Sequence, residues 1–109
     1  MKRKPVVLRT RVDRDISEAI DYYVRESGGD VALKSAHALE RAFLHIGRQP
    51  ASGAPRYAHE LDLPARRSWP VRRYPFLVVY VERNDTIDGW RVLDAQRDIP
   101  AWLRGENRI

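Results

Sequence analysis

Apolar residues change their spacing along the chain, and these changes predict one strand, two helices and then further strands. Residues 5–12 are rich in β-branched side chains and switch into alternation, which predicts a strand. Residues 13–27 and 30–46 instead place apolar side chains every third or fourth position, which is typical of amphipathic helices. Only Gly28-Gly29 separates the two helices, so we expect them to lie side by side as a hairpin. Aspartates at 13, 15 and 30 suit helix N-termini.

The second predicted helix has more apolar residues than packing on one sheet requires. One stripe consists of Ala32, Ala36, Leu39, Phe43 and Ile46, and further apolar residues lie off it at Val31, Leu33, Ala38, Ala42 and Leu44. Two interpretations are open. The helix is either buried between its neighbour and the sheet, or it presents an exposed groove that a partner helix fills.

Strand patterns dominate the C-terminal half. Residues 47–57 contain prolines and glycines and predict a loop. Residues 67–71, 76–81 and 90–96 predict strands, of which the unbroken apolar run 76–81 is central, and Pro100 opens a short helical turn through Leu103. We therefore predict a single α+β domain over residues 1–109. In it an N-terminal strand and a helical hairpin pack on an antiparallel β-sheet, in the order β-α-α-β-β-β with a short C-terminal helix.

Positive charge exceeds negative charge. The chain has 20 Lys and Arg residues against 15 Asp and Glu, a net charge of +5, which favours an anionic partner such as nucleic acid or an acidic protein segment. The excess lies in residues 1–12 and 48–83, on either side of an acidic helical segment. Most of the basic residues are arginine, which suits bidentate binding of phosphate or carboxylate, although a GC-rich genome gives the same bias.

Several classes of chemistry are excluded by what the sequence lacks. There is no cysteine, which excludes disulfides, thiolate zinc sites and a cysteine nucleophile and favours a reducing cytoplasm. The three histidines have no metal-ligand spacing, and no GxSxG, P-loop or GxGxxG motif is present, so we expect neither a metal nor another cofactor. The longest apolar run is too short to span a bilayer, and the N-terminal residues lack the apolar stretch of a signal peptide. We therefore expect no membrane association.

A basic cluster around two aromatic residues is the strongest candidate site. It consists of Arg66, Arg67, Arg72 and Arg73 around Trp69 and Tyr74, with Arg97 further along the chain. Interleaved arginines and aromatic rings bind phosphates and stack on bases. The alternative is an edge strand that is protected by charge while its aromatic residues pack in the core.

The order of five segments carries a family resemblance. These segments are Asp15-Ile16-Ser-Glu-Ala-Ile20-Asp-Tyr22-Tyr23, Pro50-Ala-Ser-Gly53, Arg67-Ser-Trp69-Pro-Val71, Tyr74-Pro-Phe-Leu-Val-Val-Tyr80 and Val92-Leu-Asp-Ala-Gln-Arg97-Asp98. Together they resemble the RelE/ParE family of bacterial type II toxins. The resemblance implies a helical hairpin on an antiparallel sheet, and a toxin that a cognate ParD-like antitoxin neutralises in a hetero-oligomer.

The resemblance also implies one of two activities. RelE-like members cleave mRNA on the ribosome with basic residues, among them an arginine, and with a tyrosine or histidine near the C-terminus. Here Arg97 matches the arginine of that pattern. The C-terminal tyrosine is missing, and Asp94 stands where a histidine often lies. The Arg97-Asp98 pair before a short apolar turn looks more like the ParE branch, whose members inhibit DNA gyrase and have no catalytic residues of their own. Gyrase inhibition is therefore the favoured function, and ribosome-dependent RNA cleavage is the alternative.

The ParE-like interpretation makes candidates of the following residues. Target or antitoxin contacts are expected at Arg66, Arg67, Trp69, Arg72, Arg73, Arg97 and Trp102, and an antitoxin groove at Leu33, Ala38, Ala42 and Leu44. In the RNA-cleavage alternative, Arg72, Arg73 and Arg97 are the catalytic candidates. A third class, a housekeeping nucleic-acid-binding module, would show steep salt dependence.

Overall fold

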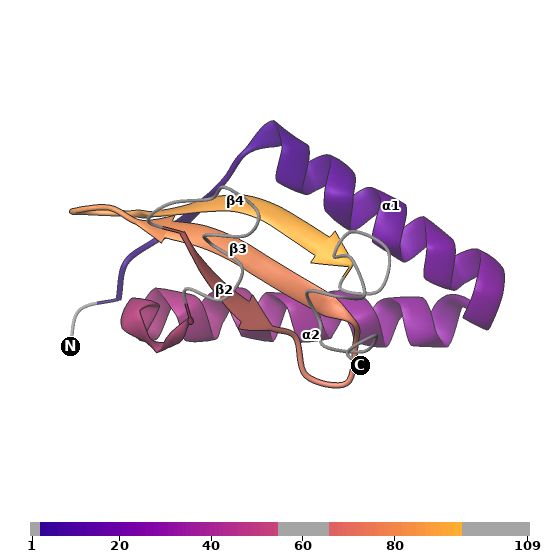
Figure 1. Ribbon diagram of the computed structural model, residues 1–109. Helices are drawn as coiled ribbons and strands as arrows, with labels where there is room; N and C mark the ends of the chain where they lie inside the picture. The colour runs from indigo at the N-terminus through magenta and orange to yellow at the C-terminus, as the bar shows by residue number, and fades with distance from the viewer. Residues whose placement is uncertain (1–2, 55–65, 95–109) are drawn as a thin grey trace, which may run out of the picture.

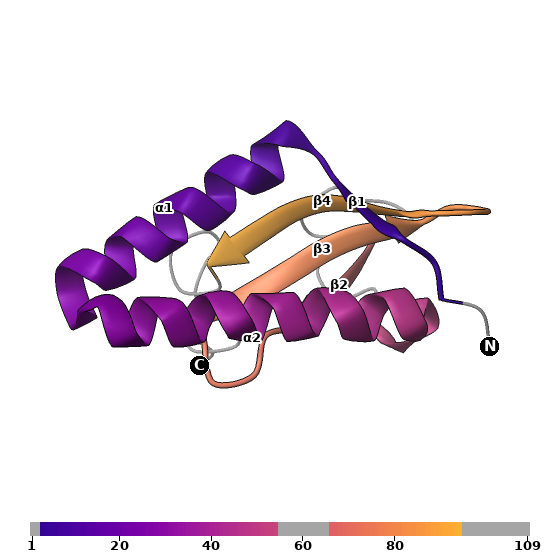
Figure 2. The ribbon, with the colours of Figure 1, turned by 180° about the vertical axis from the view of Figure 1, so that it is seen from behind.

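The computed structural model describes residues 3–54 and 66–94 and shows an α+β fold in the predicted order. Two helices cover one face of a four-stranded sheet, as the opposite views in Figures 1 and 2 show. The elements are β1 (Val6–Leu8), α1 (Thr10–Ser27), α2 (Gly29–Arg48), the 3₁₀ turn η1 (Pro50–Ser52), β2 (Arg67–Pro70), β3 (Phe76–Glu82) and β4 (Ile87–Asp94). The predicted helical turn after Pro100 lies outside the described residues.

The sheet has the strand order β1-β4-β3-β2 and is mixed. The pairs β2–β3 and β3–β4 are antiparallel, as predicted. The N-terminal strand, predicted to pack on this antiparallel sheet, joins its edge instead: β1 pairs with β4 in parallel, with Val6 opposite Ile87. A parallel pair needs a long crossover, and the helical hairpin with β2 and β3 provides one. Alternation along a short strand predicts its two faces but not the direction of its partner.

The first helix begins earlier than its sequence pattern predicts. The predicted strand runs to residue 12, but β1 ends at Leu8 and α1 begins at Thr10. Val12 is therefore a helical residue and is 1% exposed in the core. Asp15, expected near the helix N-terminus, lies on the same buried face of α1. Val12, Asp15 and Ala19 are spaced as on one face of a helix, whereas residues 8–12 alternate as in a strand. Packing on the sheet decides which of these two patterns the overlapping residues follow.

The hydrophobic core lies between the helical hairpin and the sheet. Its buried members are Val12, Ala19, Ala38, Leu39, Ala42, Ile46, Val71, Phe76, Val78, Tyr80, Ile87 and Val92. The prediction that residues 76–81 form the central strand is confirmed, because β3 lies between β2 and β4 and is buried from Phe76 to Val81. The hairpin turns at Gly28, whose φ of 91° is a conformation that favours glycine.

A buried tyrosine attaches the loop after α2 to the sheet. Tyr80 is 0% exposed; its hydroxyl donates to the Pro50 carbonyl at 2.6 Å and accepts from the Gly53 amide at 3.0 Å. A Cβ at Gly53 would collide with the Tyr80 ring and hydroxyl, so this close approach requires glycine. Burial raises the pKa of Tyr80 above its usual 10.0. The contact fixes the end of α2 beside β2.

Candidate functional site

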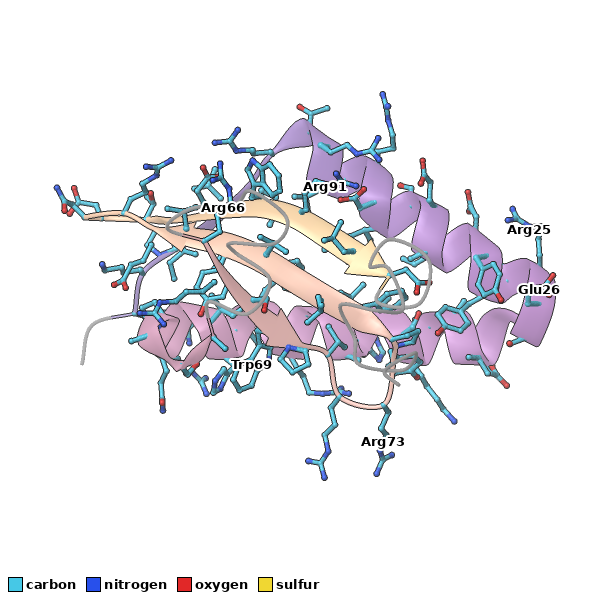
Figure 3. The ribbon with its side chains drawn as sticks, viewed as in Figure 1. Arg25, Glu26, Arg66, Trp69, Arg73 and Arg91 are labelled. Carbon is cyan, nitrogen blue, oxygen red and sulfur yellow. The ribbon has the colours of Figure 1, made fainter. Side chains whose placement is uncertain are left out.

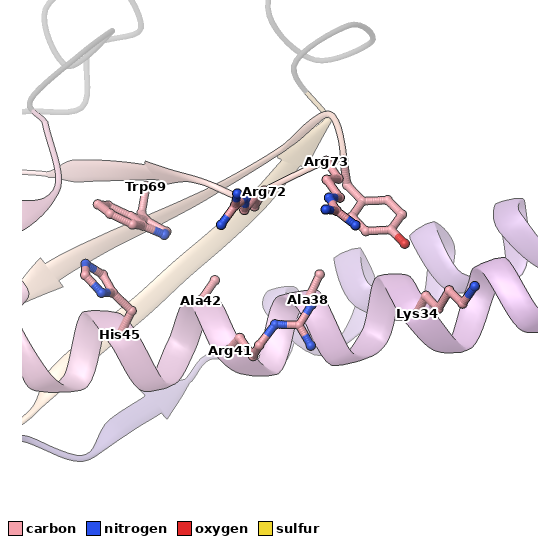
Figure 4. A pocket seen from close by; sticks show the side chains of 9 residues that line it. Lys34, Ala38, Arg41, Ala42, His45, Trp69, Arg72 and Arg73 are labelled. Atoms are coloured by element: carbon pink, nitrogen blue, oxygen red, sulfur yellow. The ribbon is translucent and has the colours of Figure 1, made fainter.

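A hollow of about 550 Å³ lies between α2 and the turn that joins β2 to β3 (Figure 4). One wall is a face of α2, and the other consists of β2 and the turn. We call it the basic hollow, and its lining residues are Lys34, Ala38, Arg41, Ala42, His45, Trp69, Arg72, Arg73 and Tyr74. Four members of the predicted basic cluster thus lie together with cations of α2 that are distant in the sequence: Trp69, Arg72, Arg73 and Tyr74.

Positive charge accumulates in the basic hollow without compensation. Among the described residues that line it, four carry cationic side chains, Lys34, Arg41, Arg72 and Arg73, and none is Asp or Glu. Among residues 3–54 and 66–94, no carboxylate forms an ion pair with any of the four. Arg41, Arg72 and Arg73 are exposed. The hollow is therefore an electrostatically favourable place for an anion.

The turn between β2 and β3 presents two of these cations on a constrained backbone. The Val71 amide donates to the Phe76 carbonyl at 2.9 Å, and the Tyr74 amide donates to the Val71 carbonyl at 3.4 Å. Arg73 has a φ of 72°, a left-handed conformation that costs a residue with a Cβ about 1–2 kcal/mol. An arginine therefore occupies a position that glycine would fill with less strain, which is characteristic of functional sites.

Two stacked rings form the end of the basic hollow next to η1. The His45 and Trp69 rings lie 4.0 Å apart with an interplanar angle of 23° (Figure 4). His45 Nε2 is 2.9 Å from Ser52 Oγ, and this hydroxyl donates to the Gln49 carbonyl at 2.7 Å. The stack fixes both rings at the edge of the site. Tyr74 also lines the hollow and is half-buried against the core.

Two other arginines of the predicted cluster lie elsewhere. Arg67 donates from Nη1 to the Gly53 carbonyl at 2.7 Å, so it supports the loop after α2. The Arg66 guanidinium lies 4.5 Å from the centre of the Trp90 ring, a cation–π contact. Figure 3 shows Arg66 well away from Arg73. Two further candidates, Arg97 and Trp102, lie outside the described residues.

The four residues of the predicted antitoxin groove do not share one environment. Leu33 and Leu44 are 58% and 47% exposed on the outside of α2. Ala38 and Ala42 are each 5% exposed, belong to the core and contribute to the α2 wall of the basic hollow. Ala38 and Ala42 are therefore buried as the first interpretation predicts, and Leu33 and Leu44 remain exposed, as an apolar groove would require. Their contact with an antitoxin stays a prediction.

Three residues of the α2 wall, Lys34, Arg41 and His45, were not predicted as site residues from the sequence. Lys34, Arg41 and His45 recur at spacings of seven and four residues, which places them on one helical face. That spacing was visible in the sequence, but cations on one helix face are ordinarily a solvated surface. Only the approach of the β2–β3 turn to this face makes them part of a site.

The described residues contain neither a metal-binding cluster nor a membrane-spanning helix. Within residues 3–54 and 66–94, no group of three His, Asp or Glu side chains is placed to hold a metal ion. No helix in that part of the chain has the length and apolar character needed to cross a bilayer. The cations and rings instead suit the binding of an extended anion.

Comparisons with known proteins agree with this architecture. The structure described as "Chromosomal ParDE TA system from P. aeruginosa" aligns with a TM-score of 0.70 at 20% sequence identity, covering 82% of this chain and 92% of that one. At this identity the match shows a shared fold. No curated protein sequence matches the chain. The model of the family described as "ParE toxin of type II toxin-antitoxin system, parDE" matches residues 6–99, so the chain belongs to the ParE family of type II toxins.

Proposed function

We propose that this toxin inhibits DNA gyrase by binding and is neutralised by a cognate ParD-like antitoxin in the cytoplasm. Membership of the ParE family supports the gyrase target. The observation that carries the proposal is the basic hollow, where Lys34, Arg41, Arg72 and Arg73 converge without an acidic partner among the described residues. A binding toxin needs such a preformed charged surface and no catalytic group.

An antitoxin has complementary features to contact. The net charge of +5 favours an acidic, partly disordered segment that folds on binding. Leu33 and Leu44 leave exposed apolar surface on α2 for an amphipathic helix. The similar structure is described as a ParDE system, which supports the same kind of assembly for this chain.

The test is supercoiling of relaxed plasmid by purified gyrase, with and without the full-length toxin freed of co-purifying antitoxin. We expect inhibition with accumulation of linear, protein-linked DNA. Arg73→Gly should weaken the inhibition, and Arg97→Ala tests the candidate outside the described residues. Supercoiling at the normal rate in the presence of a folded toxin that still stops growth would exclude gyrase as the target.

RNA cleavage is a second candidate because the basic hollow also contains groups that transfer protons. His45 and Tyr74 line the same space as Arg72 and Arg73. A ribonuclease that activates a ribose 2′-hydroxyl needs an acid–base group beside cations that stabilise the phosphorane. Mapping of mRNA 5′ ends in translating extracts separates the candidates: cleavage that His45→Ala abolishes would favour RNA, and intact mRNA would exclude it.

A further inference from the structure

We infer that the basic hollow binds the phosphodiester backbone of DNA directly, so that the toxin itself holds the DNA strand on which gyrase acts. This inference rests on the proposed function and specifies the ligand of its site. The family assignment concerns the toxin as a whole and assigns no ligand to this hollow.

The spacing of the cations fits a polyanion better than a single small anion. Lys34 and Arg41 are seven residues apart on α2, which is about 10 Å along the helix axis. One DNA strand carries a phosphate about every 3.4 Å of its helix axis, so this distance corresponds to roughly three phosphates. Arg72 and Arg73 approach the same space from the opposite wall. A bound DNA strand therefore places its row of phosphates between cations on both walls.

The mutual repulsion of these cations, which have no acidic partner among residues 3–54 and 66–94, also favours a polyanion. Like charges held close together repel each other, and Arg73 adds the strain of a left-handed backbone. A bound phosphodiester strand removes the repulsion and releases its own condensed counterions. Guanidinium groups additionally form paired hydrogen bonds with phosphate oxygens. Both effects are largest for a ligand with several phosphates.

Exposed apolar surface lies on a different face of α2, which argues against an acidic peptide helix in the basic hollow. Leu33 and Leu44 are eleven residues apart and lie about 20° from each other around the helix. Lys34 and Arg41 lie about 80–100° away from Leu33. An amphipathic helix needs apolar contacts, and in the hollow Ala38 and Ala42 are almost fully buried. The hollow offers aromatic rings instead, at Trp69 and Tyr74, and rings suit bases.

The test is binding of fluorescein-labelled DNA to the full-length toxin, measured by fluorescence anisotropy over a series of salt concentrations. Single-stranded and duplex oligonucleotides of equal length are compared. We expect binding to weaken linearly in a double-logarithmic plot against salt, with a slope of about −0.7 to −0.9 for each phosphate contact. Arg73→Gly should reduce the magnitude of that slope by about one contact.

Arg25→Gln is the matched control for the charge. Arg25 is exposed in the last turn of α1, away from the basic hollow in Figure 3, and its substitution also removes one positive charge. We expect its slope to equal that of the wild type. Arg73→Gly keeps a backbone that glycine adopts readily, so weaker binding by this variant does not arise from unfolding. Thermal melting of each variant checks this.

Three results would overturn the inference. These are no DNA binding at low salt, equal losses for Arg25→Gln and Arg73→Gly, and tighter binding of a poly-glutamate peptide of matched charge than of DNA. The last result would assign the hollow to an acidic protein segment.

The supercoiling assay separates this inference from the proposed function. Gyrase inhibition without DNA binding would refute the inference and leave the gyrase target intact. DNA binding that depends on Arg73, combined with unaffected gyrase activity, would support DNA as the ligand of the basic hollow and refute gyrase as the target.

Discussion

Arginines in two regions of this toxin have opposite surroundings. Around β1, α1 and β4, five ion pairs among the described residues join a cation to a carboxylate: Lys4–Glu82 at 2.7 Å, Arg9–Asp88 at 2.7 Å, Arg83–Asp88 at 3.4 Å, Arg11–Asp15 at 3.3 Å and Arg91–Asp15 at 2.8 Å. In the basic hollow, Arg41, Arg72 and Arg73 face no carboxylate of the described residues. The same residue type therefore stabilises the fold in one region and is available to a ligand in the other.

Asp15 explains why the paired region is structural. Its carboxylate accepts from Arg91 Nε at 2.8 Å, from Arg91 Nη2 at 3.2 Å and from the Val92 amide at 3.0 Å. In the described part of the chain, β1 pairs with β4 only from Ile87 to Gly89. Beyond that point the Asp15 carboxylate, and not a strand carbonyl, accepts from the Val92 amide. Figure 3 shows Arg91 directed towards α1. One buried side chain thus attaches α1 to the sheet.

Replacement of Asp15 by Ala should have the largest effect on stability. It leaves Arg91 and the Val92 amide without their carboxylate in a buried environment, and loss of one partner of a buried pair costs about 3–5 kcal/mol. The free energy of unfolding from urea titration measures this loss. Glu18→Ala, at an exposed position on the same helix, should change it by less than about 0.5 kcal/mol. Equal effects of the two variants would contradict the structural role of Asp15.

Tyr80→Phe should have an intermediate effect. It removes the hydroxyl that bonds to Pro50 and Gly53 and leaves two backbone groups without this partner, at a cost of about 1–3 kcal/mol. Because the hydroxyl supports the frame of the basic hollow and not its charge, the folded variant should still inhibit gyrase. Urea titration and the supercoiling assay measure the two properties. A variant of wild-type stability would show that the hydroxyl contributes little.

Arg73→Gly should reverse the pattern of the Asp15 variant. Glycine relieves the left-handed strain at this position but adds flexibility to the unfolded chain. We expect the relief of strain to be the larger effect, so the free energy of unfolding should rise by up to about 1 kcal/mol. Gyrase inhibition should fall because one cation of the basic hollow is lost. Differential scanning calorimetry and the supercoiling assay test both parts. A clear loss of stability would instead place Arg73 among the structural arginines.

Asp88→Asn should have the smallest effect, and it should depend on pH. The hydrogen bond from Arg9 lowers the pKa of Asp88 below its usual 3.8. The stabilisation by the Asp88 carboxylate is therefore present above pH 3.8 and is lost as the pH falls through the lowered pKa. Urea titrations at neutral and acid pH should show a small difference between variant and wild type that disappears in acid. A difference that grows in acid would have the wrong sign for this ion pair.

The candidate site illustrates what a sequence pattern conveys about function. Trp69, Arg72 and Arg73 could be selected because they are neighbours in the chain, and the structure places them together. Arg66 and Arg67 belong to the same run of residues but contact Trp90 and Gly53 instead. Proximity in the sequence does not determine on which side of an edge strand an arginine lies.

The order of elements, the helical hairpin and the central strand could be predicted from the chain, because local spacing of apolar residues sets which periodic structure buries them. Packing of the whole domain was needed to show that β1 runs parallel to β4, that α1 begins at Thr10, and which cations meet a carboxylate. Those outcomes depend on contacts between residues far apart in the chain, such as Asp15 with Arg91 and α2 with the β2–β3 turn. Periodicity describes the faces of one element, whereas the partner of each face is set by packing of the whole domain.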